Sequence, residues 1–142
     1  GKFAVVSIDL NNFKSINDTM GNEGGDRVLR SVADRGKELA DSGLSGTVDF
    51  IARLGGDEFA IIYDNVEESY IYELIKRFNK MNEELKNRNS IVPPIALSGG
   101  IAKGDEIDTT DTLFRKADIA LYFVKKHGRG KIEIYNIDMK RE

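Results

Sequence analysis

The sequence predicts an α+β fold, because apolar runs of strand length alternate with longer stretches in which apolar residues recur at helical spacing. The order along the chain is strand, helix, strand, strand, helix, strand, followed by one further helix and strand. A β-α-β-β-α-β core with helices on one face of a mostly antiparallel sheet is the ferredoxin-like or palm arrangement. With 142 residues the chain suits one domain, and we expect residues 1–142 to form it.

Five apolar runs have strand character. Residues 3–9 are almost continuously apolar and end in a carboxylate, which is typical of a strand buried on both faces. Residues 47–54 and 59–63 flank a tight link at 55–58 and predict a hairpin. Two further strands are expected at 95–102 and 131–135.

Three helices follow from the spacing of apolar residues. The first is expected over residues 26–41 and the second over 67–87. Thr109 or Thr110 is suited to cap the third, which glycine-rich sequence breaks at 127–130. Residues 11–25 are polar and contain three glycines, so they predict a short helical turn and a loop.

Composition excludes several chemistries. The chain has no Cys and one His, so disulfides, thiolate catalysis and His or Cys metal clusters are ruled out. The net charge of −3 argues against binding to nucleic acid, which usually requires a basic surface. No apolar run approaches the roughly 20 residues of a bilayer span, so we expect no membrane contact by this domain. The single His127 is given no role.

The predicted topology brings three carboxylates together. It places the first strand antiparallel to the third, so Asp9 would lie beside Asp57 and Glu58. Clustered carboxylates beside a sheet commonly hold Mg²⁺, which keeps open positions for substrate phosphates. Two such ions can clamp a phosphoryl group during displacement. The alternative is structural: Asp9 ends a strand and Asp57–Glu58 is a solvated turn.

Four segments resemble one family. Residues 53–59 read R-L-G-G-D-E-F and resemble the signature hairpin of GGDEF domains, the diguanylate cyclases. Residues 9–21 are similar to the family's D-x-D-x-F-K-x-x-N-D-x-x-G segment, and residues 25–29 to its G-D-x-x-L. Residues 117–129 are similar to A-D-x-A-L-Y-x-A-K-x-x-G-R. The chain is therefore identified as a member of this family.

The resemblance implies a metal-dependent active site. Asp9 and Asp57 would bind metal through their side chains and Leu10 through its carbonyl, with Glu58 beside them. Two Mg²⁺ or Mn²⁺ ions per active site are implied. Asp57 or Glu58 would accept the proton of the attacking 3′-hydroxyl, and Lys14 belongs to the same catalytic set.

The resemblance also implies a GTP site. Asn17 and Asp26 match the family's guanine readers, since a carboxylate can accept from guanine N1–H and its amine together. Lys14, Lys125 and Arg129 match positions that neutralise the triphosphate. Gly55 and Gly56 would let the hairpin backbone approach the nucleotide. Structural alternatives remain for each group: turn residues, a helix-start acid at Asp26, and cations that favour a helix C-terminus.

The implied reaction joins two GTP molecules into cyclic di-GMP and releases two pyrophosphates. Each protomer holds one GTP, so a second copy of the domain is required in a two-fold dimer. The alternative function is a GTP-binding regulatory module that controls an adjoining domain. Residues 135–142 resemble the linker into an EAL phosphodiesterase domain, although similar short helices also end stand-alone cyclases. A parent protein could carry a sensory N-terminal domain and a C-terminal EAL domain. The domain would be cytoplasmic, or the cytoplasmic portion of a membrane-anchored parent.

The sequence departs from the family pattern at several positions. Asn11 stands where relatives often have Asp, Asn22 where they have His, and Gly130 where they often have Asn. Gly46 occupies the Arg position of the R-x-x-D product-inhibition site, whose Asp49 is present. The usual N-terminal D-x-L-T-G-L-x-N-R segment is missing. None of these departures removes a residue expected to touch metal or substrate, so we expect activity to survive.

Overall fold

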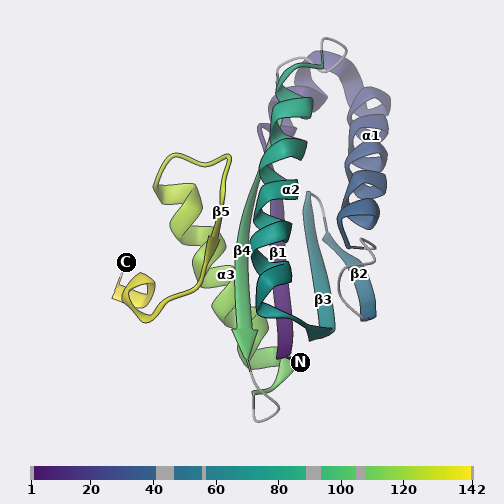
Figure 1. The fold of residues 1–142 in the computed structure, drawn as a ribbon. Coiled ribbons are helices and arrows are strands. Elements are labelled where there is room, and N and C mark those ends of the chain that lie inside the picture. The colour runs from purple at the N-terminus through teal and green to yellow at the C-terminus, as the bar shows by residue number, and fades with distance from the viewer. Residues whose placement is uncertain (1, 41–46, 56, 89–93, 105–107, 142) are drawn as a thin grey trace.

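The computed structural model describes residues 2–40, 47–55, 57–88, 94–104 and 108–141 (Figure 1). Within these ranges the chain forms β1 (Lys2–Asn11), α1 (Phe13–Ala40), β2 (Thr47–Gly55), β3 (Glu58–Val66), α2 (Glu68–Lys86), β4 (Ala96–Gly104), α3 (Thr110–Lys126), β5 (Ile132–Ile134) and a short 3₁₀ helix, η1 (Ile137–Arg141). This order confirms the predicted β-α-β-β-α-β core and the α-β unit that follows it.

Strand β1 occupies the centre of the sheet, whose strand order is β2-β3-β1-β4-β5. It runs antiparallel to β3 on one side and to β4 on the other. Only the pairing of β4 with β5 is parallel among the described strands. The predicted α+β fold of the ferredoxin-like or palm type is therefore confirmed. A central strand needs apolar side chains on both faces, which explains the nearly continuous apolar run in the first part of β1.

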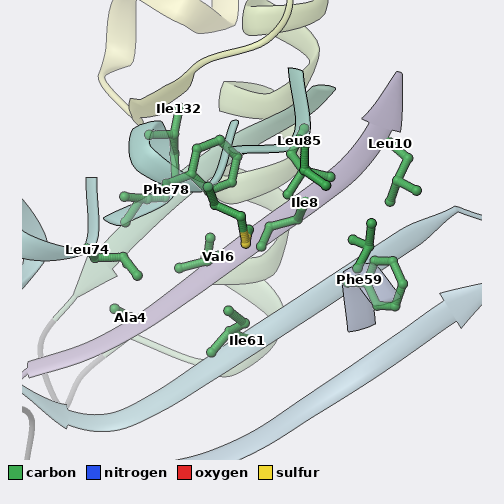
Figure 2. Close-up of a cluster of buried hydrophobic side chains, with 14 of the residues drawn as sticks. Ala4, Val6, Ile8, Leu10, Phe59, Ile61, Leu74, Phe78, Leu85 and Ile132 are labelled. Carbon is green, nitrogen blue, oxygen red and sulfur yellow. The ribbon is translucent and has the colours of Figure 1, made fainter. Parts of the chain in front are cut away.

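The helices cover both faces of the sheet (Figure 1). Alternate residues of β1, among them Val6 and Ile8, pack in the main core beneath α1 and α2 (Figure 2). On the opposite face Val5 packs with Leu113 and Ala117 of α3 in a smaller cluster. The predicted placement of the core helices on one face of the sheet is therefore confirmed for α1 and α2, and the additional helix α3 packs on the opposite face.

Helix α1 begins earlier than the sequence indicated. The segment expected as a turn and loop is helical from Phe13, and a kink at Gly21 (φ 76°, ψ 169°) joins it to the rest of α1. Ile16 is fully buried and Phe13 packs against the same core. The first part of α1 is thus held by tertiary packing, and Gly21 supplies the positive φ that joins the two helical parts.

Helix α3 begins as predicted at a threonine cap. The Thr112 amide donates to Thr109 Oγ1 at 3.1 Å, which satisfies one of the free N–H groups of the first turn. The backbone of α3 then lies directly against β4 at Gly100. A Cβ on Gly100 would overlap the Ala117 carbonyl oxygen and the Leu121 amide nitrogen. Glycine is therefore required for α3 to pack this closely on the sheet.

We expect Gly100→Ala to lower the free energy of unfolding by about 3 kcal/mol, because the backbone of α3 would have to move away from β4. Urea denaturation followed by circular dichroism measures this change. Asn79→Ala, at an exposed position of α2, is the control and should change stability by less than about 0.5 kcal/mol. Equal stability of the two variants would contradict the close packing of α3 on β4.

Candidate active site

The site lies where β1 ends beside the start of β3. Asp9 and Glu58 are Cα partners in the antiparallel register. One residue further on, the Leu10 amide donates to the Asp57 carbonyl at 3.1 Å. The expected convergence of Asp9 with the 57–58 segment is therefore confirmed for the backbone. Gly55 ends β2 opposite Glu58, and Gly56 lies outside the described residues.

Asp9 and Asp57 form a carboxylate pair. The Asp9 side chain is buried, and its Oδ1 has no hydrogen-bond partner. Partial burial raises the pKa of the Asp57 carboxyl above its ordinary value, and the negative charge of Asp9 raises it further. A cation placed between the two carboxylates would relieve both their repulsion and the unmet bonding of Asp9 Oδ1.

Glu58 does not complete a three-carboxylate cluster. Its side chain is exposed although its backbone pairs with Asp9. Across the described part of the chain, no three His, Cys, Asp or Glu side chains gather in an arrangement suited to a metal ion. The prediction that three carboxylates converge is wrong in this respect, because strand pairing fixes backbones and leaves the reach of an exposed side chain undetermined.

A polar row on β1 faces α3. Among the residues whose side chains are described, the buried polar ones are Ser7, Asp9, Asn11 and Ser98. Ser7 donates to Asp118 Oδ1 at 2.8 Å, Asp9 forms an ion pair with Lys125, and Asn11 Oδ1 lies 3.4 Å from Arg129 Nη1. Three alternate residues of the strand thus contact three residues on α3 and the loop after it.

Lys125 and Arg129 therefore reach the site from the last turn of α3 and the loop that follows. The Lys125 side chain is only 25% exposed, and its ammonium balances the charge of Asp9. Lys14, by contrast, is exposed in the first turn of α1. The structure brings Lys125 to the carboxylate pair and Arg129 to the end of β1.

Asn17 and Asp26 lie on α1, one on each side of the kink at Gly21. The Asn17 amide rests directly on the backbone of Gly25, where a Cβ would overlap its Oδ1. Asp26 lines a cavity of about 290 Å³ together with Leu29, Arg30, Ala33 and Phe59. Since Phe59 follows Glu58 in β3, this cavity adjoins the hairpin.

Two residues near the site could not be identified from the sequence. Asn82 of α2 and Ser98 of β4 both hydrogen-bond to the loop after α3. A signal existed for the surrounding polar row, since residues 7–11 of β1 alternate strictly between polar and apolar. Of the proposed product-inhibition positions, Gly46 lies outside the described residues, and Asp49 lies in β2, where the structure describes the backbone alone.

The structure thus combines a palm-like sheet with a carboxylate pair at the hairpin end of its central strand, and this combination agrees with one protein family. The family model described as "Diguanylate cyclase, GGDEF domain" matches residues 1–131. The chain belongs to the GGDEF family.

Comparison with individual proteins agrees with this assignment. Diguanylate cyclase DosC of Escherichia coli is 33% identical over 138 residues, covering 96% of this chain and 29% of that protein. The chain therefore spans less than a third of that relative. The GGDEF domain of YfiN from Pseudomonas aeruginosa superposes with a TM-score of 0.82 at 29% identity, over 99% of this chain and 80% of that one.

A third comparison involves a ligand complex. The GGDEF domain of DgcB from Caulobacter crescentus, solved with c-di-GMP, has a TM-score of 0.78 and 28% identity, over 94% of this chain and 77% of that one. Within the described ranges of the present chain, no helix combines the length and apolar character needed to cross a membrane.

We expect Lys125→Met to lower the free energy of unfolding by about 2 kcal/mol in chelator-treated buffer, because it leaves Asp9 buried beside Asp57 without a cation. Asp9→Asn combined with Lys125→Met should regain most of that loss. Urea denaturation measures all variants, and Lys80→Met, at an exposed position of α2, is the control. A double variant no more stable than Lys125→Met would contradict the pairing.

Proposed function

We propose that this domain is a diguanylate cyclase that condenses two GTP molecules into cyclic di-GMP and releases two pyrophosphates. The observation that carries the proposal is the buried Asp9, with its unpartnered Oδ1, beside Asp57 at the hairpin of a chain of this family. Each 3′-hydroxyl attacks the α-phosphate of the other GTP, so the proton leaves that hydroxyl and pyrophosphate leaves the phosphorus. The reaction takes place in the cytoplasm, where GTP is available.

The residues present fit a divalent metal. Asp9 and Asp57 offer hard oxygen donors, and the Leu10 carbonyl faces the hairpin because its amide donates to Asp57 across the strand pair. We propose that these groups hold Mg²⁺ or Mn²⁺, two ions per active site, with Glu58 nearby. When bound, the metal lowers the pKa of the 3′-hydroxyl and stabilises charge on the phosphate.

The remaining side chains bind and orient GTP. Asn17 and Asp26 read the guanine edge from α1, next to the cavity that Asp26 and Phe59 line. Lys14, Lys125 and Arg129 neutralise the triphosphate, and Gly55 and Gly56 let the hairpin approach it. Asp57 or Glu58 accepts the proton of the 3′-hydroxyl.

Catalysis requires two copies of the domain. One site holds one GTP, and the attacking and accepting nucleotides must face each other, which a two-fold dimer achieves. Fusion of a parallel dimeric coiled coil to Gly1 should therefore raise the activity per molecule. A fused chain that binds GTP but forms no product would instead favour a regulatory GTP-binding module that controls an adjoining domain.

We expect Asp57→Asn and Asp9→Asn to lower the turnover of the fused chain at least about a hundredfold, because each removes a negative oxygen from the proposed metal site. Formation of cyclic di-GMP from GTP and Mg²⁺, followed by chromatography, measures turnover. Glu83→Gln, on the exposed face of α2, should leave it unchanged. Near-native turnover in either aspartate variant would disprove the metal assignment.

We expect the chain to prefer GTP to ATP, and expect Asp26→Ser and Gly25→Ala each to reduce that preference about tenfold. The first removes a guanine acceptor, and the second displaces the Asn17 amide from the backbone of Gly25. Calorimetric affinities for both nucleotides provide the measurement, with Asp34→Ser on the exposed face of α1 as control. Equal affinity for GTP and ATP in the unmodified chain would rule out this assignment.

A further inference from the structure

The loop after α3 has an unusual backbone. Gly128, Arg129 and Gly130 all have positive φ, at 109°, 60° and 68°. Two of them are glycines, for which this region is accessible, but Arg129 carries a Cβ and is disfavoured there. Such a conformation persists only where the surrounding structure imposes it.

Two side chains impose it by binding both backbone groups of Gly130. The Gly130 amide donates to Ser98 Oγ at 3.0 Å, and its carbonyl accepts from Asn82 Nδ2 at 3.2 Å. On the other side of the loop, the Arg129 amide donates to the Val124 carbonyl at 2.9 Å. Arg129 is therefore bracketed by fixed hydrogen bonds.

Asn82 is itself held rigidly. Its Oδ1 accepts from the Leu97 amide at 2.7 Å, and its Nδ2 donates to the Leu97 carbonyl at 3.0 Å. The Asn82 side-chain amide thus hydrogen-bonds to both backbone groups of Leu97, and its Nδ2 also donates to the Gly130 carbonyl. Because α2 lies on the face opposite α3, Asn82 ties this loop to both layers of the fold.

Ser98 links the loop backbone to the Arg129 side chain. Its hydroxyl accepts from Asn11 Nδ2 at 3.1 Å and lies 3.2 Å from Asn11 Oδ1. Asn11 Oδ1 in turn lies 3.4 Å from Arg129 Nη1, beside the buried Asp9. The same serine therefore fixes the backbone that presents the guanidinium and the amide that faces it.

We propose that Asn82 and Ser98 are positioning residues for Arg129: they hold the left-handed loop so that the guanidinium stands at the end of β1 before substrate arrives. This inference rests on the proposed function, in which Arg129 binds the triphosphate. Fixing the cation beforehand reduces the ordering cost of binding, so loss of either clamp weakens phosphate binding and spares guanine binding.

The test compares two ligands of the 142-residue chain. One is a GTP analogue with a methylene bridge between the α- and β-phosphorus, titrated with Mg²⁺ by calorimetry; the other is guanosine, titrated by NMR. Asn82→Ala, Ser98→Ala and Arg129→Ala should each weaken the analogue on the order of tenfold and leave guanosine unchanged. Asn79→Ala, on the same helix and exposed, should change neither affinity.

Two further variants separate positioning from folding. Asn82→Asp keeps the acceptor for the Leu97 amide and removes the donor to the Leu97 and Gly130 carbonyls, so it should reproduce the Asn82→Ala loss of analogue affinity, and thermal unfolding checks that the variant is folded. Asn82→Ala combined with Arg129→Ala should bind the analogue no more weakly than Arg129→Ala alone, because the clamp acts through that side chain.

The outcomes are distinct. Additive losses in the double variant, equal losses for analogue and guanosine, or native analogue affinity in Asn82→Asp and Ser98→Ala would overturn the positioning role while Arg129→Ala still showed the proposed phosphate contact. Native affinity in Arg129→Ala would overturn the phosphate assignment of Arg129, and the positioning role with it.

Discussion

The central strand β1 is the constraint on which the rest of the molecule depends. Because it has neighbours on both sides and helices on both faces, each of its side chains must be either apolar or partnered. One set of alternate residues enters the main core beneath α1 and α2. The other set changes from apolar Val5 to Ser7, Asp9 and Asn11, each of which contacts α3 or the loop after it. Because successive side chains of a strand point to opposite faces of the sheet, β1 presents core residues on one face and the polar residues of the proposed site on the other.

Burial of the Asp9 carboxylate beside a second carboxylate lowers the stability of the folded domain. Such a cost is common at sites where function competes with stability. Partial burial raises the pKa of the neighbouring Asp57 carboxyl, the negative charge of Asp9 raises it further, and one oxygen of Asp9 has no hydrogen-bond partner. Lys125 offsets part of this cost from the last turn of α3. A site arranged in this way attracts cations.

Much of this could be predicted from the sequence because it depends on local pattern and strand order. The order of apolar runs suggested a ferredoxin-like topology, and that topology pairs β1 with β3 and brings Asp9 beside Asp57. Only a short helical turn and a loop were expected over residues 11–25, whereas α1 begins at Phe13, where Phe13 and Ile16 pack against the core. The exposed Glu58 side chain and the hydrogen bonds of Asn82 could not be predicted, because side-chain contacts between elements that are distant in sequence produce no periodic pattern in the sequence.

Two departures from the family pattern meet in one hydrogen-bond network. Asn11 stands where relatives often have Asp, and Gly130 where they often have Asn, and both bond to the Ser98 hydroxyl. An amide at position 11 can donate to Ser98 and still offer its oxygen to Arg129, whereas an ionised carboxylate could only accept. At position 130 the backbone has φ 68°, a region that glycine enters freely and asparagine tolerates better than most residues. Since a Cβ at position 130 would be 3.7 Å from Ala96 Cβ, an ordinary contact, either residue fits there. The two positions therefore share one hydrogen-bond network, which holds the left-handed loop that presents Arg129.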